Sequence, residues 1–185
     1  LVGSEMCIRD RGRMGACLMK EADIVRSCVK AMISESSSEV SVKCRIGVDE
    51  FESYNFFKEF ISNVYDSGCN TFFVHARKAF LKGLDPKKNR TLPPLKYDYV
   101  YKLKREMPQL NIVINGGIQT LEECHNQLKS VDGVMIGRSI QANPFFLEEV
   151  DHQFYNQKMR SLKKNQVIAK YFEYVKENIN LSEII

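Results

Sequence analysis

The sequence predicts an α/β fold, namely the C-terminal half of a (β/α)8 TIM barrel followed by the start of a helical domain. Short apolar strands alternate with amphipathic helices, which is typical of parallel βαβ units. Four such units are visible in 185 residues, whereas a complete barrel needs about 250 residues. Charged and glycine-containing segments follow the strands, where barrels carry their active sites. An open doubly wound sheet is the structural alternative.

Hydrophobic periodicity places the individual elements. Apolar residues at helical spacing predict a helix over 16–32, and strict alternation predicts a strand over 40–46. The further strands are expected at 71–75, 111–115 and 133–136. The further helices are expected at 51–67, 97–106 and 121–128, from about Pro144, and over 166–178.

The start of the chain reads differently from the rest. The string LVGSEMCIRD has neither a helical nor a strand period and matches a translated sequencing adapter. We therefore expect residues 1–11 to be non-native and the native sequence to resume near Gly12. The expected barrel half covers 12–150, and a helical domain that is cut short covers 151–185.

Charge is concentrated in one stretch of the chain. The net charge is +4, yet ten basic and only two acidic residues lie between positions 76 and 105. This predicts either a polyanionic partner or a solvated face, and composition alone does not decide between them. No apolar run approaches the ~20 residues of a membrane span. Six scattered cysteines without a CxxC pair favour reduced thiols in a cytosolic protein.

Three side chains are candidates for chemistry at the expected barrel mouth. Lys43 and Arg45 share the strand face opposite to the apolar residues. A lysine inside a barrel is costly unless it meets an anion or a negatively polarised ring, and a surface lysine at an edge strand is the alternative. His75 closes the next strand, where a purely structural histidine is the alternative.

Two glycine segments predict a phosphate site. Asn115, Gly116 and Gly117 follow one strand and are expected to open a helix, and Gly137 and Arg138 do the same one unit later. Glycines let backbone N–H groups approach a phosphate closely, and a helix N-terminus adds partial positive charge. The alternative is a pair of tight turns without a ligand.

Several longer motifs together resemble the A type of the tRNA-dihydrouridine synthases. In chain order they are VKCRIG (42–47), FVHARKAFLKGLDPKKNR (73–90), PPLKYD (93–98), IVINGGIQTLEE (112–123) and DGVMIGR (132–138). The segment GRMGACLM (12–19) resembles the stretch that follows the catalytic cysteine of that family. The similarity covers roughly 12–150. The remainder matches no motif and resembles the start of that family's helical tRNA-binding domain only in its general character.

The resemblance implies an FMN enzyme that uses NADPH to reduce uridine to 5,6-dihydrouridine in the D-loop of tRNA. It also implies a cytoplasmic, monomeric enzyme without a metal or a membrane anchor. Lys43 would lie against the flavin ring, where its charge stabilises the reduced cofactor, and His75 would contact the cofactor nearby. The FMN phosphate would be held by Asn115, Gly116, Gly117, Gly137 and Arg138. The tRNA would be contacted by Lys87 and Arg90.

The resemblance leaves the proton donor unassigned. That family uses a cysteine in a Gly-Cys-Pro-Ser setting as the general acid, and the matching place near Ser4 or Glu5 lies in the suspected adapter string. Cys7 is out of register, and Cys17 is expected to serve packing. We therefore assign no catalytic residue, and expect 12–185 alone to be dimeric or aggregation-prone, to hold FMN weakly and to form no dihydrouridine.

Two other functions remain open at this point. One is another FMN-dependent barrel of the dihydroorotate or dihydropyrimidine dehydrogenase type, which does not explain the basic segment KGLDPKKNR. The other is a non-catalytic RNA-binding half-barrel.

Overall fold

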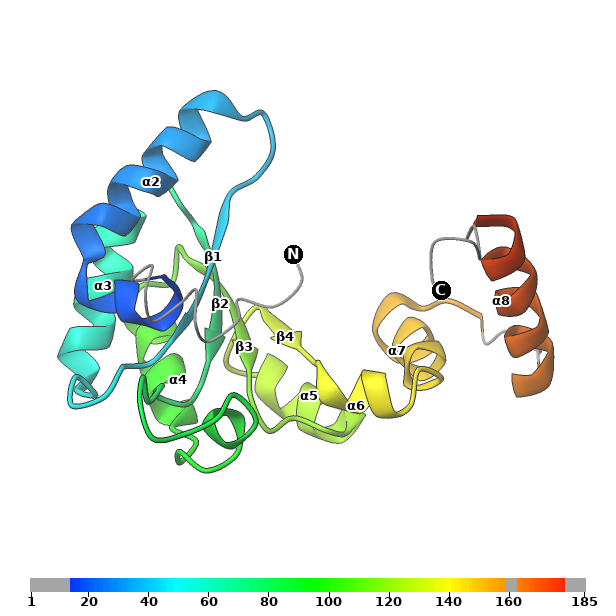
Figure 1. Ribbon diagram of the computed structural model, residues 1–185. Coiled ribbons are helices and arrows are strands. Elements are labelled where there is room, and N and C mark those ends of the chain that lie inside the picture. The colour runs from blue at the N-terminus through cyan, green and yellow to red at the C-terminus, as the bar shows by residue number, and fades with distance from the viewer. Residues whose placement is uncertain (1–13, 159–162, 179–185) are drawn as a thin grey trace. The chain divides into compact units, whose positions relative to one another are not determined.

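The computed structural model describes residues 14–158 and 163–178 (Figure 1). The suspected adapter segment and the place of the family cysteine lie outside these described residues. The chain forms two compact units, with the boundary between Ile136 and Gly137. The predicted division at 150 between a barrel half and a helical domain stays a prediction.

The first unit is built on a four-stranded parallel sheet. Its strands are β1 (Ser41–Arg45), β2 (Thr71–His75), β3 (Asn111–Asn115) and β4 (Gly133–Met135). Their order in the sheet is β1-β2-β3-β4, all parallel, so spatial order follows chain order without a reversal. This confirms the predicted α/β class with a parallel sheet. Closure of such a sheet into a barrel stays a prediction.

The strand register separates a set of buried apolar side chains from a row of polar side chains at the carboxyl ends of the strands. Cys44 pairs with Val74 and Val74 with Ile114, and these three side chains are buried. One position further along, Arg45 pairs with His75 and His75 with Asn115. Cross-strand partners project to the same face, and neighbours along a strand project to opposite faces. The polar residues at the carboxyl ends of β1, β2 and β3 therefore share one face, on which Lys43 is followed across the sheet by Phe73 and Val113.

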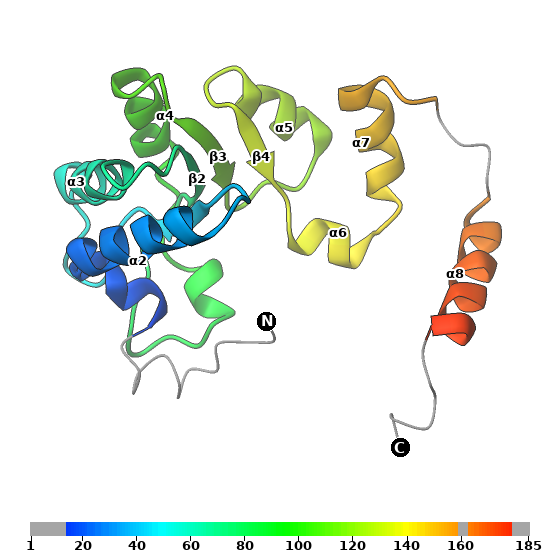
Figure 2. The same cartoon turned by 90° about the horizontal axis from the view of Figure 1, so that it is seen from above.

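Helices flank the strands of the first unit (Figure 2). The helices of the first unit are η1 (Gly15–Lys20), α2 (Ala22–Glu35), α3 (Tyr54–Tyr65), η2 (Lys88–Arg90), α4 (Tyr97–Glu106) and α5 (Leu121–Leu128). Helix α3 begins after Ser53, whose hydroxyl oxygen accepts a hydrogen bond from the Phe56 N–H at 3.1 Å. Its buried face carries Phe57, Ile61 and Val64, each fully buried, which form the centre of the core with the apolar strand residues.

Two predicted elements differ from the structure. The helix expected over 16–32 is divided at Glu21, because that residue has φ −126° and ψ 52° and its N–H bonds back to the Leu18 carbonyl. A 3-10 turn therefore precedes α2, and no glycine or proline marks the break. The helix expected over 51–67 begins only at Tyr54, because the serine cap at position 53 fixes its first turn.

The second unit is helical. It contains α6 (Arg138–Ala142), α7 (Phe146–Tyr155) and α8 (Lys164–Asn178). Helix α7 confirms the helix expected from about Pro144, and α8 confirms the one expected over 166–178, whereas α6 was missed. Among the described helices, none has the length and apolar character needed to cross a membrane.

Candidate functional site

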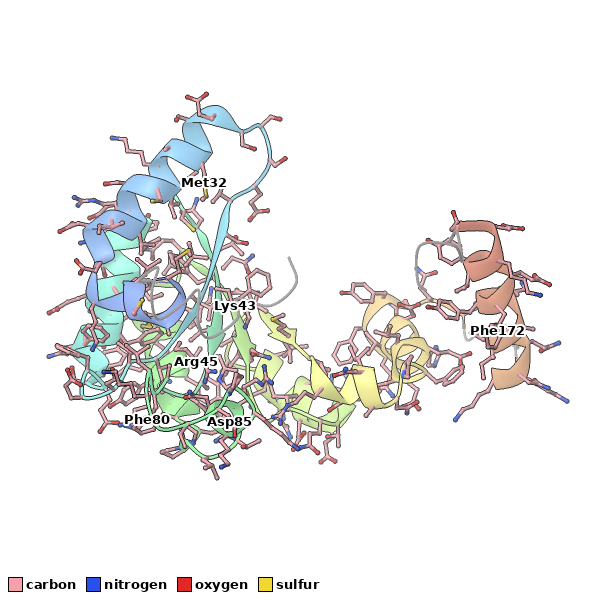
Figure 3. The ribbon with its side chains drawn as sticks, in the orientation of Figure 1. Met32, Lys43, Arg45, Phe80, Asp85 and Phe172 are labelled. Atoms are coloured by element: carbon pink, nitrogen blue, oxygen red, sulfur yellow. The ribbon has the colours of Figure 1, made fainter. Side chains whose placement is uncertain are left out.

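Four polar side chains form a row at the carboxyl ends of the first three strands. Lys43 and Arg45 come from β1, His75 from the end of β2 and Asn115 from the end of β3. Figure 3 shows the two basic residues one after the other along β1. The Lys43 Nζ lies 3.4 Å from Asn115 Oδ1, and Asn115 Nδ2 donates to the Met135 carbonyl at 2.7 Å. The sheet thus brings together residues that are 72 positions apart in the chain.

The Lys43 ammonium is poorly solvated. Its pKa lies below the usual 10.5, chiefly because of burial, and the nearby Arg45 charge acts in the same direction. The side chain as a whole is nevertheless exposed, so the surrounding protein desolvates its charged end while one side remains accessible. A ligand that brings negative charge to this side would be attracted.

Arg45 links His75 to a segment far away in the sequence. Its Nη1 lies 3.0 Å from the Asn89 carbonyl, 3.5 Å from the Lys78 carbonyl and 3.5 Å from His75 Nδ1. The shortest of these contacts is the hydrogen bond to the Asn89 carbonyl, and the His75 ring lies beside the same guanidinium. His75 is buried.

The glycine turn after β3 has a backbone that other residues adopt poorly. Gly116 has φ +115° and Gly117 has φ +76°. A Cβ on Gly116 would come within 3.1 Å of His75 Cε1, and one on Gly117 within 2.7 Å of Leu95 Cδ1. The Tyr97 hydroxyl donates to the Gly116 carbonyl at 2.5 Å, which fixes the turn from outside.

The same turn offers backbone donors. Within the described part of the chain, the N–H groups of Gly116, Gly117 and Ile118 donate to no protein acceptor. Buried backbone N–H groups are normally satisfied, so three consecutive donors without a protein partner fit an anionic ligand. They follow Asn115, the partner of Lys43.

Helix α5 is not part of this donor set, contrary to the sequence expectation. The helix does not open at the glycine turn but at Leu121, after a capping box made by Thr120 and Glu123. The Glu123 carboxylate accepts hydrogen bonds from the Gln119 and Thr120 N–H groups, which lowers its pKa. Because this carboxylate already neutralises the helix end, the glycine turn itself is the candidate anion site.

Gly137 and Arg138 lie at the start of the second unit. Gly137 is the N-cap of α6, a helix of five residues, and a Cβ there would meet nothing within 4 Å. No steric reason therefore requires glycine at this position. The predicted role of both residues in holding a phosphate stays a prediction.

The basic stretch divides into two groups. Some of its lysines make structural contacts: Lys78 pairs with Glu52 at 2.6 Å, and Lys104 pairs with Asp132 at 2.7 Å. Lys87 and Arg90, the predicted tRNA contacts, are exposed in the loop between β2 and α4. Some basic side chains of this stretch thus form ion pairs within the protein, whereas those of Lys87 and Arg90 in the loop are exposed.

The described cysteines are free thiols. They are Cys17, Cys28, Cys44, Cys69 and Cys124. Burial raises the pKa of Cys44 to about 12, so this thiol stays protonated at neutral pH. Cys17 is half-buried and its Sγ donates to the Met14 carbonyl at 3.1 Å.

Comparison with known proteins assigns the family. The model of the family described as dihydrouridine synthase (Dus) matches residues 6–184. The chain is 45% identical over 177 residues to the tRNA-dihydrouridine(20/20a) synthase of Pasteurella multocida. The aligned region covers 94% of this chain and 54% of that protein. The synthases of the same name from Vibrio cholerae and Synechocystis are 46% and 44% identical, again over 94% of this chain and 54% and 53% of theirs.

The chain belongs to the dihydrouridine synthase family. This confirms the resemblance inferred from the motifs. The chain spans about half the length of the curated relatives it matches.

Proposed function

We propose that the chain supplies the flavin-binding part of an enzyme that reduces uridine to 5,6-dihydrouridine in the D-loop of tRNA. The observation that carries the proposal is the pairing of Lys43 with Asn115 beside three unused backbone donors at the carboxyl edge of the sheet. A site with one lysine and a cradle of N–H groups suits a ligand with a phosphate and a polar ring. The names of the relatives support tRNA as the substrate.

FMN is the cofactor that we propose for this site. When bound, it would carry reducing equivalents from NADPH to the uracil ring. The N–H groups of Gly116 and Gly117 would bind its phosphate together with Asn115, and Gly137 and Arg138 would add further phosphate contacts. Lys43 would place its charge against the ring, and His75 would contact the cofactor nearby. The strand order without reversal supports a barrel as the complete fold, rather than a doubly wound sheet.

The exposed loop residues Lys87 and Arg90 are proposed to contact the tRNA backbone. Phosphate contacts of this kind hold an RNA while the target base is brought to the active site. The described cysteines provide no assigned proton donor, and the place that matches the family cysteine, near Ser4 or Glu5, lies outside the described residues. The complete enzyme is proposed to act as a monomer in the cytoplasm.

Charge reversal in the loop distinguishes an enzyme that acts on tRNA from the alternative, a flavin-dependent barrel enzyme that acts on a small substrate. The test protein is this chain from Gly12 joined to the N-terminal part of the Pasteurella multocida relative, called the completed enzyme below. Lys87→Glu with Arg90→Glu should weaken tRNA binding and flatten the slope of log K against log salt by roughly 0.7–0.9 per lost contact. NADPH oxidation by a small electron acceptor should remain nearly unchanged.

The control carries the same charge change elsewhere. Lys30→Glu with Lys129→Glu replaces two exposed lysines on α2 and after α5, and should leave the salt slope at its parent value. A loss of both tRNA binding and NADPH oxidation in the loop variant would show that the loop supports the fold, and would contradict its assignment to RNA.

A further inference from the structure

Asn89 is an unusual residue in the basic loop because it is buried among exposed charges. It is 4% exposed, while Lys87, Lys88 and Arg90 around it are exposed. Buried amides are retained where they are fully hydrogen-bonded, because an unpaired one costs free energy. The contacts of Asn89 therefore indicate what it does.

The Asn89 side chain closes the loop on itself. Its Oδ1 accepts from the Phe80 N–H at 2.8 Å, and its Nδ2 donates to the carbonyls of Phe80 at 2.7 Å and Leu84 at 3.4 Å. These bonds join position 89 to position 80 across nine residues. The only regular element of this loop among the described residues is η2, which has three residues.

The Asn89 main chain fastens the closed loop to the sheet. Its carbonyl accepts from Arg45 Nη1 at 3.0 Å, the same guanidinium that contacts His75. Figure 3 shows Arg45, Phe80 and Asp85 at the same end of the first unit. The loop that carries Lys87 and Arg90 is thus fixed to the polar row through Arg45.

We infer that Asn89 is the positioning residue of the RNA-binding loop, which presents Lys87 and Arg90 in one arrangement relative to the candidate active site. This inference rests on the proposed tRNA function of those two residues. A loop ordered before binding loses less conformational entropy when the RNA docks, so its charges contribute more to affinity. Asn89 itself touches no RNA and acts through its neighbours.

The test uses the completed enzyme and unfractionated tRNA, with binding measured by fluorescence anisotropy over a range of salt concentrations. Asn89→Ala removes three side-chain hydrogen bonds within the loop. It should weaken tRNA binding by roughly tenfold or more, which is the loss expected when hydrogen bonds from charged side chains to phosphate are no longer made. The salt slope should fall by roughly 1.4–1.8, corresponding to two phosphate contacts. The matched control is Thr91→Val in the same loop, which removes only local bonds to the Lys87 and Lys88 carbonyls and should change little.

A double-mutant cycle separates positioning from general stability. Adding Lys87→Ala and Arg90→Ala to the parent should weaken binding strongly, whereas adding them to Asn89→Ala should have little further effect. Hydrogen exchange of the Phe80 amide should accelerate in Asn89→Ala, while that of Val74 in β2 should not. Additive effects, an unchanged salt slope or an unchanged Phe80 amide would overturn the inference.

A second variant covers the case in which Asn89→Ala does not fold. Asn89→Ser retains a hydroxyl near Phe80 and should give an intermediate loss of affinity. If neither variant folds, Asn89 is a stability residue and the inference is refuted. If the lysine and arginine substitutions leave tRNA binding of the parent unchanged, the proposed function of the loop fails first, and that outcome is distinct from a failure confined to Asn89.

Discussion

Replacing Lys43 with methionine is expected to lower uridine reduction by the completed enzyme roughly 10²-fold, the usual cost of removing one preorganised charge or donor from an active site. Methionine keeps the length of the side chain and removes its charge. The Asn115 amide still donates to the Met135 carbonyl, so the turn should remain in place. Turnover is measured as dihydrouridine formed per FMN bound. Parent-level turnover with FMN retained would contradict the role of the lysine.

The pH dependence of FMN binding tests whether the charge of Lys43, rather than the shape of its side chain, attracts the cofactor. The pKa of Lys43 is lowered by burial, and an anionic ligand prefers the protonated form. Affinity should therefore be full below this lowered pKa and decline as the pH rises through it, beginning below 10.5. In Lys43→Arg the charge persists over this range, and the decline should be much weaker. Deprotonation of the flavin itself affects both proteins equally, so identical pH profiles would contradict the prediction.

Replacing Gly116 with alanine is expected to abolish FMN retention. At φ +115° an L-residue is strained, and the added Cβ would press on the His75 ring at 3.1 Å and on Leu95 at 3.2 Å. The turn must then change its backbone, and the positions of the adjacent N–H groups change with it. Retention is measured as flavin absorbance that remains with the completed enzyme after gel filtration.

Gly83→Ala is the matched control for this change. Gly83 also has a positive φ, +81°, yet a Cβ there meets nothing within 4 Å. Both variants should lose stability by about 1–2 kcal/mol from backbone strain, but only Gly116→Ala should lose the flavin. Equal flavin retention in the two variants would show that the turn does not hold the cofactor.

Elements with a clean hydrophobic period were predictable to the residue. The strands Thr71–His75 and Asn111–Asn115 and the helices Tyr97–Glu106 and Leu121–Leu128 have the predicted bounds. Where backbone conformation alone sets an element, as at Glu21, the sequence offers no signal. The capping box of Thr120 and Glu123 also has a sequence signal, a threonine three residues before a glutamate, and this signal indicates that α5 begins after the glycine turn and not at it.

The candidate site was predictable in part. Alternation along one strand was enough to place Lys43 and Arg45 on the polar face, since the period of a strand is two. The contact of Arg45 with Asn89 joins residues 44 positions apart through an irregular loop, and no local pattern predicts such a contact. For the same reason, Asn89 reads in the sequence as an ordinary loop asparagine.

Amide chemical shifts during FMN titration test the central claim most directly. The ¹⁵N–¹H correlation spectra are recorded on the completed enzyme, labelled with ¹⁵N at glycine and isoleucine, and weak binding is visible at high ligand concentration. We expect FMN to shift the amides of Gly116, Gly117 and Ile118 most strongly, because these are the unused donors of the turn. Riboflavin, which lacks the phosphate, should leave them nearly unchanged. Shifts that are absent from these three amides, or equal with both ligands, would contradict the assignment of the turn as the phosphate site.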